Sequence, residues 1–281
     1  MTPSWCTIIR VKKLNYRYKN YRYSVILLKQ IVKTDFKLRY QGSILGYAWS
    51  LLRPILLFLI LYVVFVQGLK LGNDIPNFPI YLLLGIVLWN FFAEMTSMSL
   101  TSIVSRGDLI RKIRIPRWII ILSASVTALI NLSLNLLVVG VFMLFSNVDL
   151  MRSAAIMPFI LLQLYMFSLG VSLILSASFV KYRDVSYIWE VMMQAGFYVT
   201  PIIYSLAQIK NVMYQKLIMA SPVATAMQDG RHALVTPESP TISMVYGSQM
   251  ARLIPYIITV TVLVIGVLYF KREAKSFAEN L

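Results

Sequence analysis

Residues 118–148 read WIIILSASVTALINLSLNLLVVGVFMLFSNV, a run of 31 residues that contains no Asp, Glu, Lys or Arg. A helix that crosses the hydrocarbon core of a bilayer, roughly 30 Å thick, needs about 20 mostly apolar residues. This run is therefore long enough to span a membrane. The whole chain shares its character, since 58% of the 281 residues are hydrophobic and 14% are charged, against about 45–50% and about 25% in soluble domains.

Five further charge-free runs lie along the chain, at 54–69, 75–93, 153–180, 191–209 and 253–270. The run at 54–69 is the shortest, but Arg53 before it can extend its charged group to the membrane interface. We therefore expect an all-α membrane protein with six transmembrane helices, at about 50–69, 77–98, 118–145, 154–180, 188–205 and 252–270. Residues 1–49 are expected to form a cytoplasmic segment, 50–270 the transmembrane domain and 271–281 a cytoplasmic tail.

The basic residues orient this arrangement. The chain carries 27 Lys and Arg against 11 Asp and Glu, a formal net charge of +16. Of the 27, 21 fall on one side of the six spans, in residues 1–53, 103–117, 181–190 and 271–281. Because Lys and Arg are enriched in cytoplasmic loops, we expect both termini in the cytoplasm. The first 24 residues are basic and aromatic with no apolar run, so we expect no signal peptide.

Residues 22–40 have the pattern of an amphipathic helix. Apolar residues recur at the helical period beside a cationic stripe: Val25, Leu28, Val32 and Phe36, with Lys29, Lys33 and Lys37. A basic amphipathic helix before a first span is typical of one lying in the plane of the membrane interface. The pattern fits a lipid anchor and a mechanical element equally well.

Residues 210–252 are the only long segment expected on the non-cytoplasmic side. They are too charged to span the membrane and too apolar for a free loop. We expect short re-entrant helices that dip into the outer leaflet before the last span. Irregular backbone at that depth needs a cover of protein or a water-filled cavity, so both a pathway exit and tight packing without function remain open.

The residue inventory excludes several function classes. The sequence contains no Gly-x-x-x-x-Gly-Lys-[Ser/Thr] phosphate loop. A single His and a single Cys cannot build a His/Cys metal site, and His232 has no nucleophile motif nearby. Basic residues spread over four loops suit topology better than nucleic-acid binding. We therefore expect no enzyme, no cofactor and no nucleic-acid partner for this chain.

Glu94 is the one acidic residue in the second predicted span. A buried acid in a membrane helix is a functional candidate, although ion-driven transporters usually use several in relay. Pairing of Glu94 with a basic residue or a lipid headgroup is the preferred interpretation, so transport energy would come from elsewhere.

Aromatic residues are better candidates for a transport pathway. They lie at helical spacing in the first and fifth predicted spans: Phe58, Tyr62 and Phe65, then Phe197, Tyr198 and Tyr204. Aromatic faces stack against sugar rings, and tyrosine hydroxyls hydrogen-bond to them. Aromatic packing or an interfacial belt would give the same pattern.

Five short motifs, in order along the chain, resemble those of polysaccharide ABC exporter permeases, a type-two ABC transporter family that includes O-antigen, teichoic-acid and capsule exporters. They are LRYQGSILGYAWSLLRP at 38–54, LIRKIRIPR at 109–117, YRDV at 182–185, PVATAMQDGR at 222–231 and EAKSFAE at 273–279. One departure is Arg53, where relatives often carry a neutral polar residue.

The resemblance implies a homodimer in a bacterial or archaeal cytoplasmic membrane, with two copies of a separate ATPase that binds ATP and Mg. The cargo would be a glycan linked to undecaprenyl diphosphate, passing between subunits along the aromatic residues of spans one and five, with the re-entrant helices gating the exit. The ATPase-coupling surface would comprise Lys29, Lys33, Lys37, Asp108, Arg111, Lys112, Arg114, Arg183 and Asp184.

Two alternatives share the predicted architecture. One is a type-two ABC exporter of drugs or small lipids, and the other is a membrane scaffold that transports nothing. The long outer segment argues against a scaffold. The sequence does not name the glycan or say whether the ATPase has a carbohydrate-binding domain.

Overall fold

The computed structural model describes residues 23–37, 43, 46, 48–68, 75–112, 116–146 and 152–277, and the regular elements in these ranges are all helical. This confirms the predicted all-α class for the described part of the chain. A helix occupies residues 23–37. The elements that follow are α2 (Ala48–Leu61), η1 (Tyr62–Gly68), α3 (Phe78–Ser102), η2 (Val104–Arg106), α4 (Gly107–Lys112), α5 (Trp118–Phe145), η3 (Arg152–Ile156), α6 (Met157–Lys181), α7 (Val185–Val199), η4 (Leu206–Gln208), α8 (Val212–Ala220), α9 (Pro222–Leu234), α10 (Ile242–Tyr246), η5 (Gln249–Arg252) and α11 (Leu253–Glu273).

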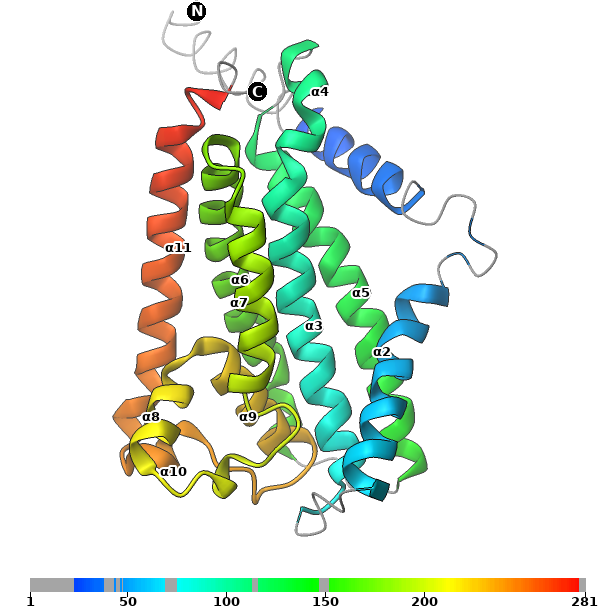
Figure 1. Cartoon of the computed structure of the whole chain (residues 1–281), viewed down its shortest axis with the longest axis vertical. Helices are drawn as coiled ribbons and strands as arrows, with labels where there is room; N and C mark the ends of the chain where they lie inside the picture. The colour runs from blue at the N-terminus through cyan, green and yellow to red at the C-terminus, as the bar shows by residue number, and fades with distance from the viewer. Residues whose placement is uncertain are drawn as a thin grey trace, which may run out of the picture.

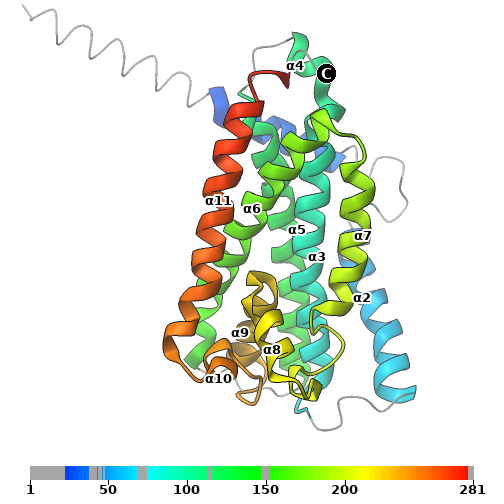
Figure 2. The ribbon, with the colours of Figure 1, turned by 60° about the vertical axis from the view of Figure 1, so that its left-hand side comes forward.

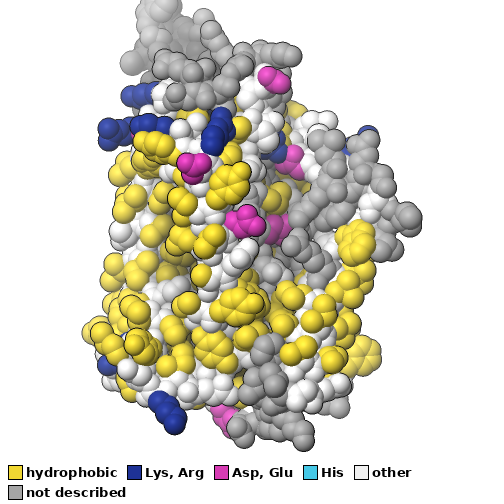
Figure 3. All heavy atoms as spheres, viewed as in Figure 1, with side chains coloured by type: hydrophobic (Ala, Val, Ile, Leu, Met, Phe, Trp, Pro, Cys, Tyr) yellow, Lys and Arg dark blue, Asp and Glu magenta, His cyan; other side chains and the backbone are white. Residues whose placement is uncertain are grey.

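Within the described part of the chain, four helical stretches are long and apolar enough to cross a membrane: Phe78–Ser102, Trp118–Phe145, Ser153–Lys181 and Gln249–Glu273. They match four of the six predicted spans and run along the long axis of the molecule (Figure 1). A broad hydrophobic band covers the middle of the surface, with Lys and Arg near its two ends (Figure 3). These features indicate a multi-pass membrane protein.

The first and fifth predicted spans correspond to shorter α-helices. Helix α2 has 14 residues and continues into the π-helical η1, while α7 has 15. Helix α7 ends at Val199 because the next residue, Thr200, precedes Pro201 and is extended, with φ −73° and ψ 135°. The six-span arrangement therefore stays a prediction at these two segments.

Helix α3 occupies the centre of the bundle. It begins at a left-handed Asn77, with φ 56°, and Pro79 stands in its first turn, where a missing N–H has no cost. It packs against α5, α6, α9, α7 and α2. Most of its side chains are buried, including Tyr81, Leu82, Leu84, Ile86, Leu88 and Met95. Its position gives these five helices a common packing partner.

Helices α6 and α11 approach each other closely at two glycines. A Cβ atom at Gly266 would lie 2.5 Å from the carbonyl oxygen of Gly170, and one at Gly170 would lie 2.8 Å from Cα of Leu263. In membranes, small residues permit this backbone-to-backbone packing where the hydrophobic effect between helices is absent. The crossing joins the last helix to the bundle.

Helices α8, α9 and α10 gather at one end of the bundle (Figures 1 and 2). Helix α9 follows the N-cap Ser221, starts at Pro222 and packs against α3 and α6. These helices lie in the segment 210–252 for which short helices are predicted. Their re-entry into a bilayer stays a prediction.

The opposite end carries the helix at 23–37, α4 and the end of α11 (Figure 1). Phe277 is buried there, and its ring lies 5.6 Å from that of Phe270 at a steep angle. The guanidinium of Arg117 lies over Phe277, 5.8 Å from the ring centroid. The C-terminal turn is thereby packed onto the start of α5.

Gly266→Ala should destabilise the α6–α11 crossing, because its Cβ would meet backbone that cannot rotate away. Overpacking of this kind costs about 1–3 kcal/mol. We expect a lower apparent Tm for the purified variant in detergent. Gly140→Ala on α5 is the matched control, since nothing lies within 4 Å of its Cβ position; equal Tm values for the two variants would contradict the close approach.

Candidate functional site

Helix α7 is seated on α3 by a glycine. A Cβ atom at Gly196 would lie 2.7 Å from Cη2 of Trp89, so the indole of α3 lies directly against the α7 backbone. Phe197 adds an edge-on contact with Trp89, with ring centroids 6.2 Å apart, and Trp189 makes a similar contact with Phe92 at 6.1 Å. These contacts fix which face of α7 turns toward α3.

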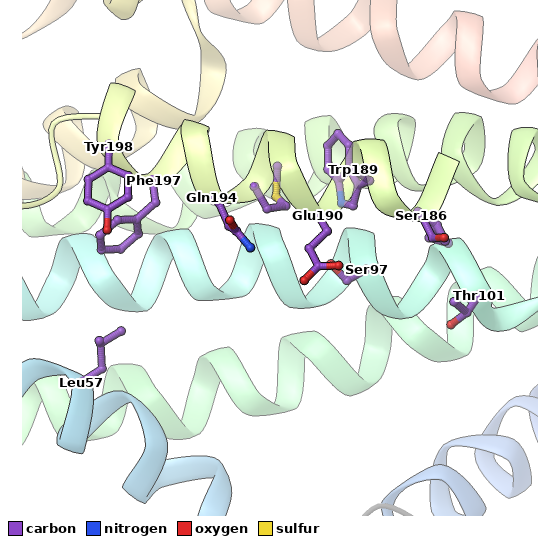
Figure 4. A pocket seen from close by; sticks show the side chains of 11 residues that line it. Leu57, Ser97, Thr101, Ser186, Trp189, Glu190, Gln194, Phe197 and Tyr198 are labelled. Atoms are coloured by element: carbon purple, nitrogen blue, oxygen red, sulfur yellow. The ribbon is translucent and has the colours of Figure 1, made fainter. Parts of the chain in front are cut away.

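A cavity of about 640 Å³ opens between α2, α3 and α7 (Figure 4). Helix α2 contributes Leu57, and the other two helices supply Ser97, Leu100, Thr101, Ser186, Trp189, Glu190, Met193, Gln194, Phe197 and Tyr198. Aromatic rings therefore lie beside hydroxyl, amide and carboxylate groups. This mixture suits a ligand with both apolar faces and hydrogen-bonding groups.

The six aromatic residues predicted for the pathway do not share one surface. Phe197 and Tyr198 line this cavity, and Tyr198 is 67% exposed. Phe58 is buried; it packs edge-on against Phe142, and its ring lies tilted to that of Tyr62, with the centroids 5.8 Å apart. Helices α2 and α7 therefore line the same cavity, but α2 lines it with Leu57 and not with a predicted aromatic residue.

The remaining two predicted aromatic residues lie elsewhere. The Tyr204 hydroxyl donates to the carbonyl oxygen of Val199 at 2.7 Å, where α7 ends. This bond satisfies one of the free carbonyls that every helix C-terminus leaves. The side chain of Phe65 lies outside the described residues.

The pathway predicted from the sequence contained only aromatic residues and lacked the polar residues that line this cavity. Glu190 and Gln194 point from α7 into the space beside Ser97 and Thr101 of α3 (Figure 4). Their spacing of four residues on α7 puts them on one helical face. Glu190 borders the charge-free run at 191–209, and this position is the signal that could have identified it.

A second cavity, of about 620 Å³, lies between α2, α3 and α5. Glu94 lines it and accepts a hydrogen bond of 2.7 Å from Nδ2 of Asn131 on α5. Sequence interpretation favoured a basic residue or a lipid headgroup as the partner of Glu94, which stays a prediction beside this amide contact. Ser97 lines both cavities.

The residues predicted to couple to an ATPase lie on three elements at one end of the bundle (Figure 1). Those elements are the helix at 23–37, with Lys29, Lys33 and Lys37; α4, with Asp108, Arg111 and Lys112; and the turn before α7, with Arg183 and Asp184. The guanidinium of Arg183 lies 5.2 Å from the ring centroid of Phe179. Arg114 lies outside the described residues.

An ion pair attaches the helix at 23–37 to the end of α3. Both carboxylate oxygens of Asp35 accept hydrogen bonds from Nη2 of Arg106, and both side chains are mostly buried, at 17% and 19% exposure. A cavity of about 360 Å³ beside this pair is lined by Thr101 and Ser105, among others. Neither Asp35 nor Arg106 was singled out by the sequence patterns.

Arg231 of α9 is completely buried and makes three hydrogen bonds to backbone carbonyls. Its Nε donates to the Tyr81 oxygen at 3.0 Å, Nη2 to the Ile202 oxygen at 2.8 Å, and Nη1 to the Pro201 oxygen. The guanidinium also lies 3.5 Å from the centroid of the Tyr81 ring. Burial lowers the pKa of Arg231 to about 10, so the group keeps its charge at neutral pH.

Gly85 provides the space that Arg231 needs. A Cβ atom at this position would come within van der Waals overlap of Nη2 of Arg231. The side chain of α9 can therefore cross the surface of α3 and reach the chain just after α7. Arg231 links three elements that are far apart in sequence, and it was not a predicted site residue.

Known proteins resemble this chain over most of its length. The sequence profile of the family described as ABC-2 type transporter matches residues 26–235. The O-antigen export system permease protein RfbA of Myxococcus xanthus is 29% identical over 221 residues, 78% of this chain and 82% of that protein. Two proteins of the same name from Klebsiella pneumoniae are 28% identical over 263 and 266 residues, in each case 93% of this chain and 97% of the relative.

Arg231→Lys should destabilise the fold although it keeps the charge, because an ammonium group cannot reproduce the planar fork that reaches Pro201 and Ile202. A buried acceptor left without a donor costs about 1–3 kcal/mol. We expect a clearly lowered apparent Tm in detergent. Arg252→Lys, at an exposed arginine bonded to Ser243, should change it little; the same small effect at both positions would show that the fork is unimportant.

Proposed function

Because the chain belongs to the ABC-2 type transporter family, we propose that it is the membrane subunit of an ATP-driven exporter of polysaccharide. The cargo in this proposal is a glycan linked to undecaprenyl diphosphate, such as O-antigen or teichoic acid. The observation that carries the proposal is the similarity over 93% of the chain to proteins named as O-antigen export permeases. The resemblance that five short motifs indicated therefore extends over nearly the whole chain.

The chemistry of the cavity between α2, α3 and α7 supports a carbohydrate cargo. Sugar rings have apolar faces that stack on aromatic side chains and rims of hydroxyl groups that need hydrogen-bond partners. Phe197 and Tyr198 offer the first kind of contact, and Glu190, Gln194 and Ser97 offer the second. A small hydrophobic drug would leave these polar side chains without hydrogen-bond partners.

A separate partner protein supplies the energy for export. In this proposal two copies of the chain associate with two copies of a cytoplasmic ATPase, which binds ATP and Mg. The helix at 23–37, α4 and the turn before α7 form the coupling surface, since they share one end of the bundle. The exposed Arg183 and Asp184 stand at the start of α7, so a push on them would act on a wall of the cavity.

The proposed placement in the membrane follows from charge. The end with the helix at 23–37 and the C-terminal turn faces the cytoplasm of a bacterium or archaeon, in a six-span arrangement across the cytoplasmic membrane. Helix α2 with η1 and helix α7 then serve as the first and fifth spans. Helices α8, α9 and α10 would re-enter the outer leaflet and gate the exit.

Deleting the gene should trap lipid-linked glycan on the cytoplasmic side and abolish surface polymer. Fractionation of the lipid-linked pool, combined with immunoblotting of intact cells for surface glycan, measures both quantities. Complementation with the wild-type chain should restore export. Unchanged surface polymer in the deletion strain would refute the proposal, and accumulation of a small lipid or drug instead would favour the other exporter class.

Tyr198→Ala should slow glycan export in the complemented strain, because it removes an exposed ring from the cavity without opening a buried core. Loss of one stacking contact of about 1 kcal/mol corresponds to a several-fold lower rate. Pulse-chase appearance of surface glycan gives the rate. Phe159→Ala on α6 removes a ring of equal exposure (66%) that does not line the cavity, and an equal slowing by both variants would argue against a pathway at Tyr198.

A further inference from the structure

Helix α3 carries a row of polar residues along one face, in the half that leads to the end with α4. The row comprises Asn90, Glu94, Ser97 and Thr101, here called the α3 polar stripe. Steps of four, three and four residues place these side chains above one another on one side of a helix. Ser97 and Thr101 are exposed although most of α3 is buried. An exposed face turned to lipid would instead be apolar.

The cavities around the α3 polar stripe adjoin one another. Ser97 lines both the 640 Å³ and the 620 Å³ cavity, and Thr101 lines both the 640 Å³ and the 360 Å³ cavity. Met98 is shared by the 620 Å³ and 360 Å³ cavities. The three cavities therefore adjoin one another along the stripe, from the Asp35–Arg106 ion pair to Asn90 further along α3, and are together called the groove.

Asn131 places an unused hydrogen-bond acceptor at this groove. Its side chain is only 3% exposed and lines the 620 Å³ cavity. Because a carboxylate accepts hydrogen bonds, the amide orientation is fixed, with Nδ2 donating to Glu94 at 2.7 Å. Among the described residues, nothing donates to Oδ1 of Asn131. A buried acceptor without a donor costs about 1–3 kcal/mol, which a ligand with a hydroxyl or N–H group would recover.

The charges that line the groove indicate which part of a lipid-linked glycan it suits, the sugar units or the diphosphate. The described side chains that line the 640 Å³ and 620 Å³ cavities include Glu94 and Glu190 but no Lys or Arg. Among these described side chains, a diphosphate would meet the carboxylate of Glu190 and no cation. Sugar hydroxyls can donate to carboxylate and amide oxygens, and Trp49, 44% exposed at the 620 Å³ cavity, offers a ring for stacking.

We propose that the α3 polar stripe and Asn131 form a hydrated groove that binds glycosyl units of the cargo, and not its diphosphate, before export. The inference rests on the proposed function, since it specifies where the polysaccharide is held. It adds α3 and α5 as walls that bind sugar, beside the aromatic residues of α7. Asn131 is the buried acceptor at the base of this groove.

Cysteine labelling tests whether the groove is hydrated. In a Cys6→Ser background, which removes the single native cysteine, Ser97→Cys should react with a charged, membrane-impermeant maleimide in inverted membrane vesicles. Ile130→Cys is the control, because Ile130 is exposed, neighbours Asn131 in sequence and lines none of the three cavities. We expect labelling of Ser97→Cys at least tenfold faster. Equal slow labelling of both would overturn the hydrated groove.

Protection from labelling tests the ligand. Inverted vesicles from cells that make the lipid-linked glycan should label Ser97→Cys about threefold more slowly than vesicles from cells whose first glycosyltransferase is inactive. The latter contain undecaprenyl phosphate without sugar. The same labelling rate in both strains would overturn the proposal, whether both are slow because the lipid phosphate occupies the groove or both are fast because nothing occupies it.

Asn131→Leu tests the acceptor. We expect about tenfold slower glycan export, with a modestly lowered apparent Tm because Glu94 loses this donor. Gln163→Leu on α6 is the control, since Gln163 is 4% exposed, has an unpartnered Nε2 and lines none of the three cavities. If Asn131→Leu does not fold, Glu94→Gln, which keeps the bond from Asn131, should slow export in its place. Normal export in a folded Asn131→Leu or in Glu94→Gln would refute the site while leaving the export function itself intact.

Discussion

The guanidinium of Arg231 holds together the end of the bundle that carries α8, α9 and α10, and no carboxylate of the described residues is bonded to it. Its three acceptors are neutral carbonyl oxygens, and two of them belong to Pro201 and Ile202 just beyond α7. Those oxygens are available because Pro201 ends the helix, so their residues lie outside its hydrogen-bond ladder. The same proline that shortens α7 thus creates the site where Arg231 binds. A buried charge is tolerated here because every arm of the fork finds an acceptor.

The position of α7, and with it the cavity, depends on this contact and on Gly196. One end of α7 is tied through Arg231 to α9 and α3, and Trp89 fits against the glycine near that end. Near the opposite end, which begins at Asp184, the ring of Trp189 packs against that of Phe92. Helix α7 is therefore tied by the hydrogen bonds of Arg231 at the end near α9, and it contacts α3 through aromatic packing toward the end where an ATPase is proposed to act. A rod held in this way turns a small push at one end into a tilt of the wall that carries Glu190 and Gln194.

Much of the fold could be predicted from local sequence. Long charge-free runs identify α3, α5, α6 and α11, because hydrocarbon admits few other sequences. The end of α7 was placed six residues too late, since the run continues through Pro201 and apolar composition outweighed the helix-ending signal. Arg231 looked like one more basic residue of an outer segment. Its partners stand 29 to 150 residues away, and no local pattern reports a contact of that range.

The candidate site was harder to predict from the sequence than the fold. Helical spacing selects a face of α2 or α7 but does not say what that face meets, so the buried Phe58 and the exposed Tyr198 looked alike. The polar residues of the cavity come from separate helices and form a set only after packing. The row from Asn90 to Thr101 on α3 could have been predicted from the sequence, because its spacing is helical. It was overlooked because Glu94 was treated as an isolated charge.

The length of α7 has a consequence for the surrounding lipid. Fifteen residues rise about 22 Å at about 1.5 Å per residue, whereas the hydrocarbon of a typical bilayer is about 30 Å thick. As the proposed fifth span, so short an element would be accommodated by local thinning of the bilayer or by protein that covers the gap, each at a cost that grows with the mismatch. In the proposed six-span arrangement, membrane thickness therefore enters the energetics of this protein directly. A thinner bilayer would relieve the strain around α7, so acyl-chain length becomes a physical control over the helix that borders the cavity.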